Sequence, residues 1–138
     1  MHRRFLLLGA ISAFIGVAAG AFGAHGLESR LATESLAVYE TGVRYELIHA
    51  MALLFTGLAV DRWPAAEWEK AGWMFVAGTV LFSGSLYALV LTGVRELGVV
   101  TPVGGVCLLL GWALAILAGK RSACADHRDD ATQGRGGT

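Results

Sequence analysis

The sequence predicts an all-α, polytopic membrane protein in which four transmembrane helices form an antiparallel bundle. Hydrophobic residues make up 55% of its 138 residues and charged residues only 16%, against roughly 25% charged residues in ordinary soluble domains. The mean hydropathy is +0.58, and a chain this short cannot bury so much apolar surface in water, because small folds leave much of their surface exposed. Long runs without Asp, Glu, Lys or Arg also divide the chain into apolar segments. These observations argue against an ordinary soluble enzyme.

The apolar runs define four membrane spans, each of which needs ~20 apolar residues to cross a hydrocarbon core ~30 Å thick. Three charge-free runs meet this length directly. The second run, residues 47–60, is shorter and becomes a span only if Arg44 and Glu46 enter the interface, where a long Arg side chain can reach the headgroups. A re-entrant or surface helix is the alternative for that segment. We expect spans at about residues 5–27, 42–60, 71–94 and 97–119.

The first span has an alternative interpretation, because His2, Arg3 and Arg4 precede it and Ala19-Gly20-Ala21 lies near its end. A basic start, an apolar run and small residues before a cleavage site are also the pattern of a secretory signal peptide. The run is longer than the ~7–15 residues of a typical signal-peptide core, and small residues recur throughout it. We therefore expect the first helix to be retained, and the mass of the purified protein would reveal cleavage.

The segments between the spans are short. Residues 28–46 have apolar side chains at helical spacing and extend the second span. The turn at residues 93–96 is so short that the third and fourth helices form a tight antiparallel pair. Residues 1–119 therefore make up one four-helix transmembrane domain. Residues 120–138 are polar, glycine-rich and charged, and we expect them to form a disordered cytoplasmic tail.

The basic residues indicate how the bundle lies in the membrane. One predicted side carries Arg3, Arg4, Arg62, Lys70, Lys120, Arg121, Arg128 and Arg135. The other side carries Arg30, Arg44 and Arg95. The positive-inside rule places the richer side, with both termini, in the cytoplasm.

Small residues recur at four-residue spacing and predict where the helices pack. Lipid tails remove the hydrophobic drive for helix association, so close contact between small residues holds transmembrane helices together. Glycine is in excess, at 19 of 138 residues against a usual share of ~7%. The stripes are Ser12, Gly16, Gly20 and Ala24 in the first span, Gly84, Ala88 and Thr92 in the third, and Cys107, Gly111, Ala115 and Gly119 in the fourth. They could serve packing within one chain or between chains.

The polar residues of the spans gather in their predicted outer halves, whereas the inner halves are aliphatic. Ionisable side chains at membrane depth are costly, and they usually pair or line a cavity. On the second span, the face that includes Gly42, Tyr45 and His49 carries small and polar residues, and we expect it to point into the bundle. The candidate polar cluster comprises His25, Arg44, Tyr45, Glu46, His49, Ser83, Ser85, Tyr87 and Thr101.

This cluster has three interpretations. We favour a polar network that fixes helix packing, in which Arg44 pairs with Glu40 or another carboxylate and the histidines bond to backbone carbonyls. A proton or solute pathway is the second. In the third, His25 and His49 together ligate a haem or a metal ion. The single Glu46-x-x-His49 pair falls short of a di-metal site, which needs two such pairs and further carboxylates. We therefore expect no metal or other cofactor.

Four motifs, in order along the chain, resemble those of a known family. They are Gly23-Ala24-His25-Gly26, Thr41-Gly42-Val43-Arg44-Tyr45-Glu46-Leu47-Ile48-His49-Ala50, Leu81-Phe82-Ser83-Gly84-Ser85-Leu86-Tyr87, and Thr101-Pro102-Val103-Gly104-Gly105 with Gly111-Trp112. From about Phe5 to Gly119, the chain resembles the small membrane-protein family called domain of unknown function 423, and it is similar to eukaryotic transmembrane protein 256. The resemblance implies a four-helix protein of the bacterial inner membrane. It implies no activity and assigns no functional residues.

We expect an integral membrane protein that is not an enzyme, because the sequence holds no nucleophile–base pair, nucleotide motif or metal-ligand set. A balance of 11 Lys+Arg with 11 Asp+Glu leaves no basic face for nucleic acid. The function we favour is structural or accessory: the bundle lies in the lipid bilayer and binds or helps to assemble another membrane protein, with a homo-oligomer as a further option. A small transporter or proton-coupled carrier that uses the outer polar cluster is the alternative, and a His-ligated metal or haem protein is the third.

Overall fold

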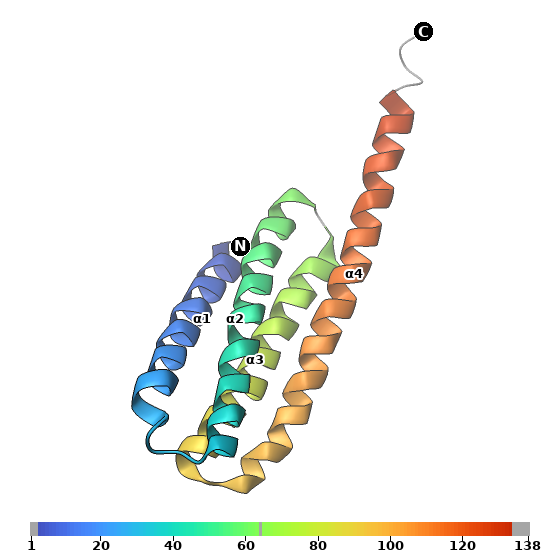
Figure 1. Cartoon of the computed structure of the whole chain (residues 1–138). Coiled ribbons are helices and arrows are strands. Elements are labelled where there is room, and N and C mark those ends of the chain that lie inside the picture. The colour runs from blue at the N-terminus through green and yellow to red at the C-terminus, as the bar shows by residue number, and fades with distance from the viewer. Residues whose placement is uncertain (1–2, 64, 134–138) are drawn as a thin grey trace.

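Helices are the only regular secondary structure in the part of the chain that the structure describes. The computed structural model describes the backbone of residues 3–63 and 65–133, and the side chains of these residues up to 123. The elements are α1 (Arg3–Phe22) with a π-helical turn (Gly23–Leu27), α2 (Thr33–Arg62), α3 (Ala66–Thr92), a 3₁₀ turn (Arg95–Val99) and α4 (Val100–Gln133) (Figure 1). Within that part, four segments are long and apolar enough to cross a membrane, namely Arg3–Leu27, Thr33–Arg62, Ala66–Thr92 and Arg95–Ala123. The prediction of an all-α, polytopic membrane protein is confirmed.

Consecutive helices run antiparallel, so their connections alternate between the two ends of the molecule (Figure 1). We call the end with Arg3, Arg62 and Ala66 the terminal end, and the end with residues 28–32 and 93–99 the distal end. α2 has 30 residues and is therefore ~45 Å long at ~1.5 Å per residue. This length exceeds a hydrocarbon core of ~30 Å, which supports a full span rather than a re-entrant helix for the second segment.

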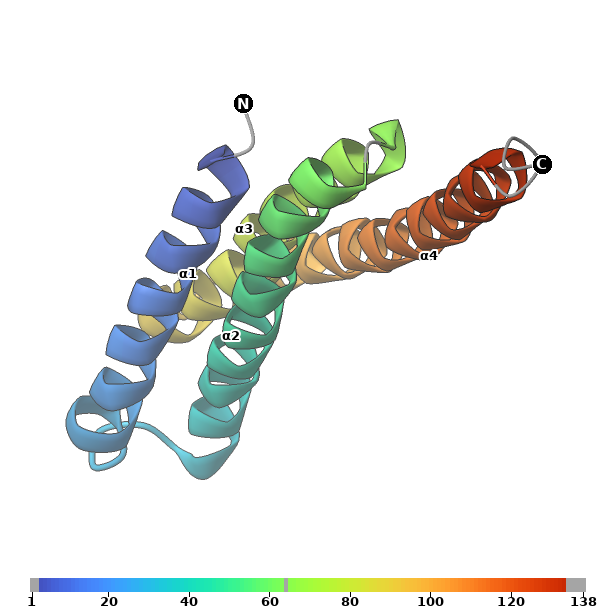
Figure 2. The same ribbon diagram turned by 90° about the horizontal axis from the view of Figure 1, so that it is seen from above.

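The four helices form an open zigzag array rather than a closed bundle. The extensive contacts are those of α1 with α2, α2 with α3 and α3 with α4. Figure 2 shows α1 and α4 on opposite sides of the α2–α3 pair. A central cluster draws one or two side chains from each helix, and it consists of Phe5, Ala52, Leu53, Ala71, Phe75 and Leu108. Because α4 does not close the array against α1, one groove remains between α1 and α3 and another between α2 and α4.

Glycines allow α1 to lie directly against α2. A Cβ added at Gly16 would lie 2.8 Å from Leu47. Gly9 and Gly23 also face α2 at distances that leave no room for a Cβ. The close contacts therefore recur every seven residues along α1 and into the π-helical turn that follows it.

α4 approaches the backbone of α3 at Gly104. A Cβ added there would lie 2.8 Å from the Cα of Phe82. Gly78 of α3 and Gly111 of α4 each contact a large side chain of the facing helix. These glycines bring the two helices closer than any larger residue would permit.

The predicted packing stripes coincide with these contacts only in part. Gly16, Gly20, Gly111 and Ala115 lie at helix contacts, Ala88 and Cys107 are half-buried, and Ala24 is exposed. Ser12 and Gly84 instead line a groove, and a Cβ added at Gly84 would meet nothing within 4 Å. The physical reason is that a four-residue repeat drifts around a helix of ~3.6 residues per turn faster than a seven-residue repeat does.

α4 continues beyond the membrane domain through Gln133, which differs from the disorder expected from residue 120 onward. This part of the helix extends past the other helices at the terminal end (Figure 1). Arg121 at its base donates a hydrogen bond to Glu67 of α3. Because helix hydrogen bonds are local, a polar segment without Gly or Pro can continue a helix that is already formed. Residues 134–138 of the expected tail lie outside the described residues.

Candidate functional site: two intramembrane grooves

The first groove lies between α1 and α3, with α2 as its floor, and we call it the α1–α3 groove. Its cavity volume is about 340 Å³. The walls are aliphatic and include Leu8, Ile11 and Ile15 of α1 and Val76 and Val80 of α3. Its polar residues are Ser12, Glu46, Thr79, Ser83 and Tyr87. The groove is therefore apolar at its walls and carries one acidic group.

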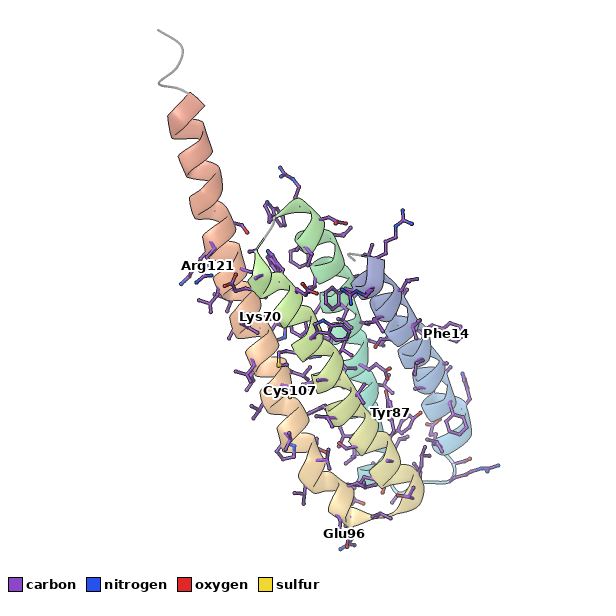
Figure 3. The ribbon with its side chains drawn as sticks, turned by 180° about the vertical axis from the view of Figure 1, so that it is seen from behind. Phe14, Lys70, Tyr87, Glu96, Cys107 and Arg121 are labelled. Carbon is purple, nitrogen blue, oxygen red and sulfur yellow. The ribbon has the colours of Figure 1, made fainter. Side chains whose placement is uncertain are left out.

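Glu46 of α2 supplies that acidic group. Its side chain is only 6% exposed, and its Oε2 accepts a hydrogen bond of 2.6 Å from the Tyr87 hydroxyl. The stem of Glu46 passes beside Gly16 of α1, where an added Cβ would lie 3.5 Å from its Cγ. Figure 3 shows Tyr87 on α3 pointing toward α1. Three helices thus contribute to placing one carboxyl group.

Tyr39 of α2 contacts both α1 and the Tyr87 ring of α3. Its hydroxyl donates a hydrogen bond of 3.0 Å to the carbonyl of Ala19 on α1. Its ring packs against that of Tyr87, with ring centroids 5.1 Å apart. Tyr39 therefore links α1 to the residue that donates to Glu46.

Two hydroxyls beside the groove have no hydrogen-bond partner among the described residues. They are the buried Oγ of Ser12 on α1 and Oγ1 of Thr79 on α3. Ser and Thr in membrane helices commonly donate to the carbonyl four residues earlier, as Thr56 does to Ala52. Ser12 and Thr79 do not, so their hydrogen-bonding capacity is unused.

The second groove lies between α2 and α4, with α3 as its floor, and we call it the α2–α4 groove. Its cavity volume is about 420 Å³. Aromatic rings of α2, α3 and α4 line it together with aliphatic residues of α4, and those of Tyr45 and Phe82 stack with centroids 4.4 Å apart. His49 and Trp112 complete this aromatic lining.

The hydrogen bonds of His49 determine its tautomer. Nδ1 lies 2.7 Å from the carbonyl oxygen of Tyr45, and a carbonyl only accepts, so Nδ1 carries a proton. Nε2 accepts a hydrogen bond of 3.2 Å from the indole Nε1 of Trp112 on α4, so Nε2 carries none. The imidazole in this arrangement is neutral, and both of its nitrogens are occupied by protein groups.

The predicted serines and threonine form bonds between helices near these grooves. Ser83 of α3 donates to the carbonyl of Gly42 on α2 over 2.7 Å. The hydroxyls of Ser85 on α3 and Thr101 on α4 are 2.7 Å apart. These bonds link α3 to both of its neighbours.

The structure divides the predicted polar cluster instead of joining it into one network. Glu46, Ser83 and Tyr87 line the α1–α3 groove, whereas Tyr45 and His49 line the α2–α4 groove. His25 lies in the π-helical turn after α1 and is exposed. Arg44 is also exposed, and the expected ion pair between Arg44 and a carboxylate does not occur among the described residues. Nor do the described residues contain a group of three or more His, Cys, Asp or Glu that could hold a metal ion.

Tyr39, Thr79 and Trp112 belong to these sites but were absent from the predicted polar cluster, although Thr79 and Trp112 each left a signal in the sequence. Thr79, Ser83 and Tyr87 follow one another at four-residue spacing and so share a helix face. Trp112 lies near the middle of a span, away from the interface where Trp is usually enriched, and its indole N–H needs a partner when buried. Ser12 was expected to serve helix packing and proved to line a groove.

Comparison with known proteins places this architecture in a family. The family model described as "Protein of unknown function (DUF423)" matches residues 19–105, which include Glu46, His49 and Tyr87. A UPF0382 membrane protein of Staphylococcus aureus (strain bovine RF122 / ET3-1) is 43% identical over 114 residues, or 83% of this chain and 93% of that protein. The UPF0382 membrane protein YwdK of Bacillus subtilis (strain 168) is 44% identical over 115 residues, or 83% of this chain and 94% of that protein. No solved structure matches the chain. Given these matches and its four candidate membrane helices, the chain belongs to the DUF423 family and is a multi-pass membrane protein.

Proposed function

We propose that this protein is a non-enzymatic accessory protein of the bacterial inner membrane that receives a transmembrane helix of another membrane protein in its α1–α3 groove. In this proposal both termini lie in the cytoplasm, as the distribution of basic residues favours. The observation that carries the proposal is the open array: α4 packs on α3 away from α1, so α1 and α3 leave a groove where a further helix can lie.

The lining of the groove supports helix docking over solute transport. Its walls are aliphatic, and Gly84 of α3 has no neighbour within 4 Å of an added Cβ. Small residues allow a second helix to approach closely in lipid. A carrier would need a polar path, whereas the aliphatic side chains of Leu8, Ile11 and Val76 surround the polar groups of this groove.

Site-specific photocrosslinking in the membranes of producing cells tests the proposal. A benzophenone side chain is introduced at Val80, which is 65% exposed and lines the groove. The matched control is Phe14, which is 77% exposed on α1 and points away from the array (Figure 3). Both side chains are exposed on this chain, but in the proposal a partner helix covers Val80 whereas Phe14 faces lipid.

We expect Val80 to form one discrete adduct with another membrane protein, with the crosslink in a transmembrane segment of that partner, and Phe14 to react with lipid. Mass spectrometry of the adduct identifies the crosslinked segment. Adducts of Val80 with lipid alone, or with a second copy of this chain, would overturn the accessory function. The same broad pattern of adducts at Val80 and Phe14 would also count against it, because no groove-specific contact would then exist.

A further inference from the structure

We propose that the helix received by the α1–α3 groove carries a basic side chain, Lys or Arg, which pairs with Glu46. This inference rests on the proposed function, because it names the chemistry of the docked helix. It concerns recognition, whereas the proposed function concerns occupation of the groove by any helix.

Glu46 forms no ion pair with a basic side chain among the described residues. Its side chain is 6% exposed, and the hydrogen bond from Tyr87 is its only polar contact within the described residues. The nearest basic residue in sequence, Arg44, is exposed, and it lies roughly 200° away around the helix, at ~100° per residue. His49 is one turn further along α2, but both of its ring nitrogens are engaged in the α2–α4 groove.

A buried carboxylate without a basic partner is energetically costly within a membrane. Carboxylates within membrane spans are rare, and they usually face a bundle interior, where they pair with an opposite charge. Glu46 belongs to the candidate span Thr33–Arg62 and lies beside Gly16, which is near the middle of the candidate span Arg3–Leu27. A cation delivered by a docked helix would supply the missing partner.

Two hydroxyls of the α1–α3 groove could also bind a basic side chain. An ammonium group has three N–H donors, and one carboxylate oxygen can satisfy only part of them. Ser12 and Thr79 line the same groove on opposite walls, and neither hydroxyl has a partner among the described residues. Thr79 is only 8% exposed. Glu46, Ser12 and Thr79 together therefore place oxygen acceptors in the lining of the groove, and the two hydroxyls, whose oxygens are buried, would turn to meet a basic side chain.

The probe is a ~20-residue Leu/Ala transmembrane peptide with a single Lys near its centre. Matched peptides carry Leu or Glu at that position. The full chain is reconstituted in vesicles of phosphatidylethanolamine and phosphatidylglycerol. It carries Cys107→Ser and Cys124→Ser, and a fluorophore is attached to the thiol introduced by Glu28→Cys. Energy transfer from labelled peptide measures affinity, and the benzophenone at Val80 reports occupation of the groove.

We expect the Lys peptide to bind about tenfold more tightly than the Leu peptide, a difference of ~1.4 kcal/mol, because polar contacts stabilise the association of membrane helices. Glu46→Gln keeps the shape and an acceptor for Tyr87 but removes the charge, and it should abolish this preference. Glu40→Gln is the matched control, because Glu40 is an exposed carboxylate on the same helix, and it should leave the preference unchanged.

The outcomes separate the inference from the proposed function. Equal affinities for the Lys and Leu peptides, with both crosslinking to Val80, would overturn the inferred pairing of Glu46 with a basic side chain. The groove would still stand as a docking site for a helix. A Lys preference that survives Glu46→Gln would also overturn the inferred pairing. If no peptide crosslinks to Val80, both the inference and the proposed docking fail.

Discussion

At the scale of single residues, the pairing of His49 with Trp112 makes these two side chains interdependent. The imidazole accepts the indole N–H through Nε2 only while Nε2 is unprotonated. The bond joins residues 63 positions apart in the sequence, so it ties α2 to α4 across α3. The Phe75 ring lies beside both, with centroids 5.8 Å from that of His49 and 5.1 Å from that of Trp112.

Trp112→Phe should lower the free energy of unfolding by about 0.5–2 kcal/mol, because it leaves the Nε2 of His49 without its donor while a ring still packs on Phe75. Reversible unfolding in detergent measures the change. A double-mutant cycle with His49→Phe supplies the control, since the loss at Trp112 should shrink when the acceptor is already absent. An unchanged loss in that background would show that the indole N–H bond contributes nothing.

At the scale of helices, glycines decide how closely neighbouring backbones lie. Gly104 contacts the backbone of α3, and Gly16 contacts a side chain of α2. A backbone cannot move aside as the tip of a side chain can, so the α3–α4 contact tolerates less change than the α1–α2 contact.

Gly104→Ala should therefore destabilise the protein by about 1–3 kcal/mol, the range typical of overpacking, because the new Cβ would meet the backbone of α3. Gly84→Ala and Gly119→Ala are matched controls, since a Cβ at either position would meet nothing within 4 Å. The controls should be neutral or stabilising by up to ~1 kcal/mol through the higher helix propensity of Ala. Thermal unfolding in detergent compares the three variants, and equal effects would contradict a close α3–α4 approach.

At the scale of the whole molecule, the antiparallel array places both described chain ends at the terminal end (Figure 1). The distal connections carry Arg30 and Arg95, whereas Arg3, Arg4, Arg62 and Lys70 lie at or near the terminal end. This asymmetry predicts that the distal end faces away from the cytoplasm.

Single Cys variants at Glu28 and Glu96, with Cys107 and Cys124 replaced by Ser, should react with a membrane-impermeant maleimide in intact cells whose outer membrane is permeable to the reagent. Both positions are exposed at the distal end. Arg62→Cys at the terminal end is the control and should react only after the inner membrane is opened. The reverse pattern would show that the protein has the opposite orientation.

The sequence predicts a feature best when its signal lies within one segment, and least well when the feature depends on how a helix is rotated against its neighbours. The charge-free run 71–94 indicates a span whatever its neighbours do, and α3 follows it closely. By contrast, Ser12 and Gly84 fit a packing stripe in sequence but line a groove in the structure, because a rotation of a few tens of degrees moves a residue off the contact face. Glu46 and His49 were grouped as neighbours at i, i+3, yet they face different grooves.

The helical class, the four spans and the candidate polar residues follow from the sequence, because apolar length and the rarity of charges in lipid are properties of each segment alone. The partners of those residues follow only from the tertiary structure. The placement of α4 on the far side of α3 leaves the α1–α3 groove open, pairs His49 with Trp112, and leaves Glu46 with Tyr87 as its hydrogen-bond partner among the described residues. Each of these depends on how helices distant in sequence are rotated and packed against one another, and no single segment contains that information.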